Sequence, residues 1–163
     1  FGGRFLLGEI LMNRKQLVII AGLGSAGMLL GAFAFQHLGG LAPCKMCIWQ
    51  RYPHVIAAII AFIAVTIPLR ILTLFDFLAA ATTSYVGFYH AGVEKGWFEG
   101  PDTCTSGPIA NLTPQQLMDQ IMAAPLIRCD EIAWSLMGVS MAGWNGIISL
   151  LLALVWLMAY KRS

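Results

Sequence analysis

The sequence has 163 residues, enough for one domain, and its composition is unlike that of a soluble protein. Hydrophobic residues make up 58% of the chain and charged residues 11%, against about 45–50% and about 25% in soluble domains. The net charge of +2 and the lack of a basic cluster argue against nucleic-acid binding. We therefore expect one all-α membrane domain over residues 1–163, with much of its surface facing lipid.

Four apolar stretches are long enough to cross a bilayer, which takes about 20 mostly apolar residues in a helix. We predict spanning helices at about 17–35, 52–69, 71–90 and 143–160. The first follows two basic residues, as the apolar part of a signal peptide would. No small-residue cleavage site follows it, so we interpret it as a retained membrane anchor.

The predicted loops lie at about 36–51 and 91–141, and the second holds six of the eight acidic residues. Within it, Thr113, Pro114 and Gln116 have the pattern of an N-cap, a first-turn proline and an N3 glutamine. Apolar residues then fall on one helical face: Leu117, Met118, Ile121 and Met122. This predicts a short amphipathic helix, which lies either on the membrane surface or against the loop itself.

Basic residues near the ends of the predicted helices give an orientation. With four spanning helices, six of them fall on one side, which we predict to be cytoplasmic together with both termini: Arg4, Arg14, Lys15, Arg70, Lys161 and Arg162. The opposite side then receives both long loops and, with them, all four cysteines. In a bacterial inner membrane that side is the oxidising periplasm, where disulfides persist.

The cysteines form a close pair, Cys44 and Cys47, and a distant pair, Cys104 and Cys129. Three kinds of chemistry fit them: structural disulfides that staple the loops, a four-thiolate zinc site, and a relay of two redox-active disulfides. A relay needs a lipid-soluble electron acceptor at the membrane end, for which a quinone is suitable. Arg51, one turn after Cys47, is suited to stabilise a thiolate or a reduced quinone oxygen.

These features resemble the disulfide bond formation protein B (DsbB) family of membrane quinone reductases. The resemblance covers nearly the whole chain from Arg14 onward. It rests on the Cys44-x-x-Cys47-x-x-x-Arg51 block, on Tyr89-His90 at the end of the third helix, and on the block that follows Cys129, Asp130-Glu131-x-x-Trp134-x-x-x-Gly138-x-x-Met141-x-x-Trp144. The chain departs from the family pattern after Cys104, at residues 105–108.

The resemblance implies a role for each cysteine. Cys104 would be attacked by a reduced periplasmic thiol oxidase of the DsbA type, with Cys129 as its disulfide partner. Cys44 would exchange with the loop pair, and Cys47 would be the thiolate next to the ring of ubiquinone or menaquinone.

Three further residues are expected near that quinone. Arg51 would support the contact between Cys47 and the ring. His90 would lie near the quinone, although an interfacial structural histidine remains an alternative. Trp49 would wall the quinone site or belong to the interfacial aromatic belt. No metal is expected at any of these residues.

Two other functions remain open at this point. The first is a quinone and thiol oxidoreductase of the vitamin K epoxide reductase type, which acts on a different partner or in the opposite direction. The second is a non-enzymatic membrane protein whose disulfides are structural. The sequence does not display the redox potentials that would decide the direction.

Overall fold

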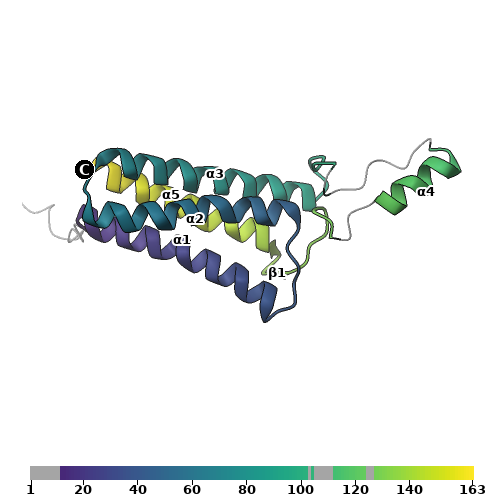
Figure 1. The fold of residues 1–163 in the computed structure, drawn as a ribbon, viewed down its shortest axis with the longest axis horizontal. Helices are drawn as coiled ribbons and strands as arrows, with labels where there is room; N and C mark the ends of the chain where they lie inside the picture. The colour runs from purple at the N-terminus through teal and green to yellow at the C-terminus, as the bar shows by residue number, and fades with distance from the viewer. Residues whose placement is uncertain (1–11, 103, 105–111, 124–126) are drawn as a thin grey trace, which may run out of the picture.

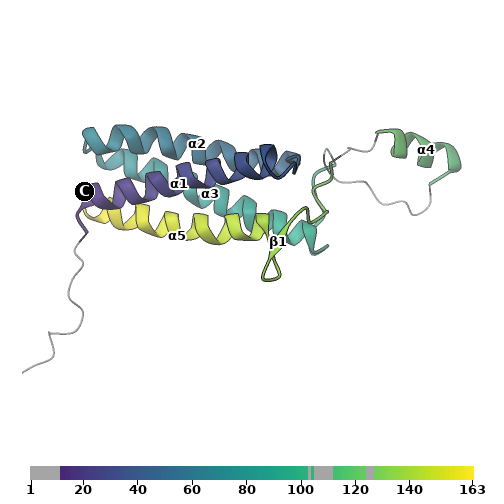
Figure 2. The same cartoon turned by 90° about the horizontal axis from the view of Figure 1, so that it is seen from below.

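Four long helices lie side by side in a bundle, as the computed structural model shows for residues 12–102, 104, 112–123 and 127–163 (Figures 1 and 2). They are α1 (Arg14–His37), α2 (Lys45–Thr66), α3 (Arg70–Glu94) and α5 (Met141–Lys161). All four are long and apolar enough to cross a membrane. The predicted all-α, four-helix membrane bundle is thereby confirmed.

The helices begin earlier than predicted on the side of the cysteines. The predicted first loop extended to residue 51, but α2 begins at Lys45, because Cys44 caps it by accepting a hydrogen bond from the Cys47 N–H at 3.2 Å. The prediction counted only the apolar run, whereas a spanning helix continues into the interface, where polar side chains are tolerated. Cys47 and Arg51 therefore lie on α2 and not in a loop.

At the same end, α3 runs to Glu94, beyond the predicted end near residue 90. It ends where Gly96 takes a positive φ of 69° and the Trp97 N–H bonds back to Gly92 O at 2.8 Å. Glycine is favoured in this left-handed conformation after a helix. One extra turn thus carries Glu94 to the level of the cysteines.

A short hairpin precedes the last helix and was not predicted. Strands β1 (Ser135–Leu136) and β2 (Val139–Ser140) pair antiparallel through a tight turn at Met137 and Gly138, both with positive φ. Ser140 then caps α5 by accepting from the Gly143 N–H at 3.2 Å. The strands are too short for an alternating pattern to be recognisable in the sequence.

The predicted amphipathic helix is confirmed as α4 (Pro114–Ala123), which lies beyond the cysteine end of the bundle in Figure 1. The Gln116 N–H bonds to Thr113 Oγ1 at 3.3 Å, and the Thr113 N–H bonds to Gln116 Oε1 at 2.9 Å. Its apolar side chains are exposed, with Met122 at 80%. Nothing in the described part of the chain covers this face.

The two ends of the described chain meet at the end of the bundle opposite the cysteines (Figure 1). Arg14 Nε donates to Ser163 Oγ at 2.9 Å, and Arg162 contacts Met12 O. Arg70 lies at this end too, where its guanidinium stacks 4.2 Å from the Tyr160 ring centroid. The basic residues predicted to share one side thus gather at one end; Arg4 lies outside the described residues.

Small residues let the helices approach closely, and Gly87 gives the sharpest case. A Cβ at Gly87 would lie 2.7 Å from Gly146 N and 3.0 Å from Ala142 O, both backbone atoms of α5. We expect Gly87→Ala to destabilise the bundle by about 1–3 kcal/mol, because overpacking outweighs the gain of about 1 kcal/mol in helix propensity. Unfolding in detergent, followed by loss of helicity, measures this.

Gly27→Ala is the matched control, since no atom lies within 4 Å of its added Cβ. Its stability should equal or slightly exceed that of the wild type. Equal stability of the Gly87→Ala and wild-type proteins would show that α3 and α5 are not held at this distance.

Candidate functional site

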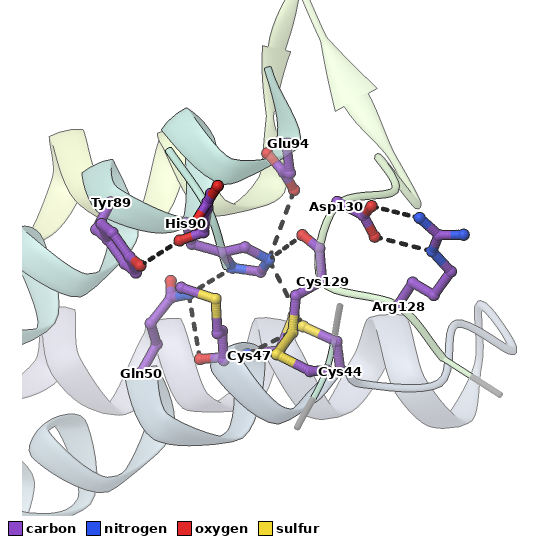
Figure 3. Close-up of a disulfide and its surroundings, with 12 residues drawn as sticks. Cys44, Cys47, Gln50, Tyr89, His90, Glu94, Arg128, Cys129 and Asp130 are labelled. Atoms are coloured by element: carbon purple, nitrogen blue, oxygen red, sulfur yellow. Dashed lines mark hydrogen bonds and ion pairs between the residues drawn. A yellow bond between two sulfur atoms is a disulfide. The ribbon is translucent and has the colours of Figure 1, made fainter. Parts of the chain in front are cut away.

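All four cysteines gather at one end of the bundle, packed with Met46, Val93 and Tyr89. Cys104 and Cys129 form a disulfide with Cα atoms 5.4 Å apart, whereas Cys44 and Cys47 are free thiols with their sulfurs 2.9 Å apart. Figure 3 shows the disulfide at Cys129 together with Cys44, Cys47 and His90. One pair is therefore oxidised and the other reduced within a single cluster, and the disulfide removes two sulfurs from the four-thiolate set that a zinc site would need.

The two pairs approach each other through Cys44 and Cys129. Their Sγ atoms and a ring nitrogen of His90 all lie within 4.8 Å of one another. The Cys129 N–H also donates to Cys104 O at 2.8 Å, which holds the two loop segments together. A thiol and a disulfide at this separation need only a small movement to exchange, because exchange proceeds by direct attack of a thiolate on a sulfur.

The surroundings of Cys44 favour its thiolate. The hydrogen bond with the neighbouring Cys47 thiol holds the pKa of Cys44 below its usual value, with burial opposing and the His90 side chain assisting. A lowered pKa increases the share of thiolate, which is the form that attacks disulfides. The pair thus has a nucleophile at its outer position.

The loop around Cys129 carries its own ion pairs. Arg128 binds both carboxylate oxygens of Asp130 (Figure 3), which holds the pKa of Asp130 below its usual range. Arg128 Nε also lies 3.5 Å from Glu131 Oε1. Since these side chains are partly exposed, the pairs contribute little to stability. They do set the local conformation on the outer side of the cysteines.

His90 connects the cysteines to the interior of the bundle (Figure 3). Its Nε2 lies 3.6 Å from Cys44 Sγ, 3.1 Å from Cys129 O and 3.9 Å from Glu94 Oε1, and its Nδ1 lies 2.9 Å from Gln50 Nε2. The residue is 2% exposed. His90 is thus positioned to act on the sulfurs of both pairs.

A large apolar cavity lies on the inner side of Cys47. It has a volume of about 370 Å³, and its walls combine aliphatic and aromatic side chains with four polar ones, Gln50, Arg51, His54 and Asn145. Trp134, Trp144 and Phe35 supply flat apolar surface. Such a mixture of apolar walls and a few polar groups is typical of a site for a small, flat, mostly apolar ligand.

Arg51 is held in place at this cavity. Its guanidinium donates to Gln36 Oε1 at 2.6 Å and to Ala32 O at 3.4 Å, and it lies 5.1 Å from the Phe33 ring centroid. These contacts come from α1, so the charge is anchored between two helices beside Cys47.

Of the residues predicted near a quinone, the structure brings Cys47 and Arg51 together at the cavity but not His90 or Trp49. His90 lines a second, smaller pocket with Cys44, Cys47 and Glu94. Trp49 is 39% exposed and lines neither pocket. Trp49 lies on α2 between the cavity-lining residues Cys47 and Gln50 but on another face of the helix, and His90 lies beside Cys44 and Cys129. The contacts of His90 and Trp49 with a quinone stay predictions.

Sequence reasoning missed Gln50, His54 and Asn145 as site residues. Asn145 Nδ2 donates to Gln50 Oε1 at 2.7 Å across 95 positions in the chain, and Asn145 Oδ1 lies 3.0 Å from His54 Nε2. Polar residues within apolar helices were the available signal, since such residues usually face the interior of a bundle. Nothing in the sequence itself pairs them.

Comparison with known proteins agrees with this geometry. The profile of the family described as disulfide bond formation protein DsbB matches residues 14–159, which include all four cysteines and all but the last two residues of the four bundle helices. The chain belongs to the DsbB family. Among relatives, the disulfide bond formation protein B of Albidiferax ferrireducens is 30% identical over 91% of each chain. That of Pasteurella multocida is 31% identical over 85% of this chain and 84% of the relative. No solved structure matches.

Because the chain belongs to the DsbB family, it is a membrane protein of disulfide-bond formation. In this DsbB-family chain the matched region holds one closed disulfide and one open dithiol in contact with a cavity.

Proposed function

We propose that the chain is an oxidoreductase of the bacterial inner membrane that reoxidises a DsbA-like periplasmic thiol oxidase and delivers the electrons to membrane quinone. One observation carries this proposal: the Cys44–Cys47 pair lies between the loop disulfide, where electrons would enter, and the apolar cavity, where they would leave. Cys44 lies within 4.8 Å of Cys129 Sγ, and Cys47 lines the apolar cavity. A purely structural disulfide set would not need an open dithiol between a disulfide and a cavity.

The first exchange takes place in the loop. A thiolate of the reduced partner attacks Cys104, which breaks the Cys104–Cys129 bond and forms a mixed disulfide. The second thiol of the partner then displaces Cys104 and leaves the partner oxidised. Two electrons now reside in the Cys104 and Cys129 thiols.

The second exchange moves these electrons inward. Cys129 attacks Cys44 of a closed Cys44–Cys47 disulfide and releases Cys47; Cys104 then displaces Cys44 and re-forms the loop disulfide. The result is a closed Cys104–Cys129 bond with Cys44 and Cys47 as free thiols, the same pattern that the structure has. Formation of a new Cys44–Cys47 bond completes the cycle.

The residues at the cavity fit a quinone. When bound, a quinone supplies an acceptor for two electrons and two protons. Arg51 would hold a ring oxygen as its charge grows, and the tryptophans would pack against the ring faces. His54 lines the cavity, and its Nδ1 has no hydrogen-bond partner among the described residues, so a polar atom remains there for a ligand.

The location follows from the same proposal. The basic end of the bundle, with both ends of the described chain, would face the cytoplasm, and the cysteine end would face the periplasm. The exposed apolar face of α4 would then lie on the outer surface of the lipid.

Anaerobic mixing of the purified protein with a reduced DsbA-like partner and a soluble quinone tests the function. We expect quinol to form in a 1:1 ratio with partner disulfide, as the two-electron balance requires. The reverse reaction, started from oxidised partner and quinol, should give far less reduced partner and quinone if the proposed direction holds. Zinc bound in place of quinone, or no quinol at all, would refute the relay.

A further inference from the structure

A line of buried hydrogen bonds joins the imidazole beside the cysteines to an imidazole on the cavity wall. From His90 Nδ1 it passes through the amides of Gln50 and Asn145 to His54 Nε2, with distances of 2.9, 2.7 and 3.0 Å. The four residues are 2–8% exposed. Because an unpaired polar group is costly in a buried setting, the direction in which each group donates is constrained.

Backbone carbonyls fix the orientation of both amides. Gln50 Nε2 also donates to Met46 O at 3.3 Å, and Asn145 Nδ2 also faces Thr83 O at 3.4 Å. Turning either amide over would place its oxygen against a backbone oxygen, with two acceptors facing each other. One direction of donation therefore satisfies the whole line, and the reverse direction does not.

This direction assigns the ring protons. An amide nitrogen only donates, so His90 Nδ1 must accept from Gln50, and the proton of the neutral ring lies on Nε2. That N–H faces Cys129 O at 3.1 Å and Cys44 Sγ at 3.6 Å. At the other end, Asn145 Oδ1 only accepts, so His54 also carries its proton on Nε2.

We propose that Gln50 is a positioning residue that holds His90 as a neutral imidazole, so that His90 serves the cysteines as a hydrogen-bond donor and not as a base. To take a proton from Cys44, the ring would have to add it at Nδ1, where it would meet the Gln50 amide hydrogens. The Nε2–H remains available to stabilise charge on the Cys44 sulfur while disulfide bonds exchange. The thiol proton leaves by another route.

Charged and titratable groups from three segments of the chain surround His90. Cys44 and Cys47 face it from α2, Glu94 lies one turn further along α3, and Arg128 and Glu131 of the loop complete the small pocket. Cys44 and Glu94 both favour a second proton on the ring, yet Cys44 Sγ and Glu94 Oε1 lie 3.6 and 3.9 Å from Nε2, which already carries a hydrogen. The second proton must enter at Nδ1, so Gln50 decides the outcome.

Nuclear magnetic resonance of protein labelled with ¹⁵N-histidine in detergent measures the two ring nitrogens directly. The protein is prepared with the loop disulfide closed and Cys44 and Cys47 reduced, without quinone or partner. At pH 7 we expect the proton of His90 on Nε2 only, and the same for His54. The resonances are assigned with His37→Gln and His54→Gln variants.

Gln50→Glu replaces the donor by an acceptor of the same shape. We expect His90 to become protonated on both nitrogens, because the carboxylate accepts from Nδ1–H. Gln36→Glu makes the same change of charge beside Arg51, outside the line, and should leave the His90 spectrum unchanged.

Three results would overturn the assignment: a proton on His90 Nδ1 in the wild type, no change in Gln50→Glu, or the same change in Gln36→Glu. If Gln50→Glu does not fold, the wild-type spectrum decides alone. The role of neutral His90 in disulfide exchange rests on the proposed function. The protonation state that the spectrum measures is independent of that function. Failure of quinone reduction and failure of this inference are therefore separate results.

Discussion

Replacing Cys47 by serine should abolish electron transfer to quinone while the loop disulfide still exchanges with a partner dithiol. Cys47 is the cysteine that lines the apolar cavity, whereas Cys44 and Cys129 meet on its outer side. A serine oxygen cannot form the disulfide bond that releases the two electrons. We expect quinol formation to fall by more than about 10³-fold, since removing one member of a reacting unit typically removes most of its catalysis.

The measurement is quinol absorbance under anaerobic conditions, with partner oxidation followed separately by thiol trapping. One equivalent of partner should still be oxidised by the loop disulfide in Cys47→Ser, without further turnover. Ile48→Ala is the matched control, since its exposed side chain lines neither pocket, and it should turn over at nearly the wild-type rate. Sustained quinol formation by Cys47→Ser would show that the electrons leave the protein elsewhere.

The helices were predictable because their signals are local. A bilayer imposes a minimum apolar length, and residues 113–116 carry a capping pattern that needs no distant partner, which the structure confirms in α4. Helix ends were less predictable. The Cys44 sulfur acts as the N-cap of α2, and cysteine is not among the residues preferred there. The sequence therefore predicts a loop for the whole Cys44-x-x-Cys47 motif, whereas Cys47 lies on α2.

The cavity was the least predictable feature. His54 appeared structural in the sequence because its partner, Asn145, lies on a different helix, and only packing of α2 against α5 brings them together. His90 lies beside the cysteine pairs, near Cys129 O, a neighbour from a distant part of the chain, and its contact with a quinone stays a prediction. Spacing within one helix shows which residues share a face, but it does not show which neighbour that face meets.

The loop cysteines give the second large effect. Cys104→Ser and Cys129→Ser should each reduce turnover of the partner by more than about 10³-fold, because either change removes the disulfide that the partner attacks. The Cys44–Cys47 pair should remain open to oxidation by quinone in both variants. Partner disulfide and quinol, each measured over many turnovers, report the loss.

The two variants should nevertheless differ in the disulfide bonds that form among their three remaining cysteines. In Cys104→Ser the freed Cys129 thiol lies within 4.8 Å of Cys44. After quinone closes the inner pair, Cys129 should attack Cys44 and release Cys47, which leaves a Cys44–Cys129 disulfide and one free thiol. In Cys129→Ser the inner disulfide should stay closed, since Cys104 is not the loop sulfur that lies beside Cys44 and His90.

Mass spectrometry of unreduced peptides distinguishes these products. A Cys44–Cys129 bond confined to Cys104→Ser would support the order of exchange in which Cys129 passes electrons inward and Cys104 meets the partner. A Cys44–Cys104 bond of equal yield in Cys129→Ser would contradict that order. Undiminished partner turnover in either variant would show that the loop disulfide lies outside the path, because no electron could then pass through a bond that no longer exists.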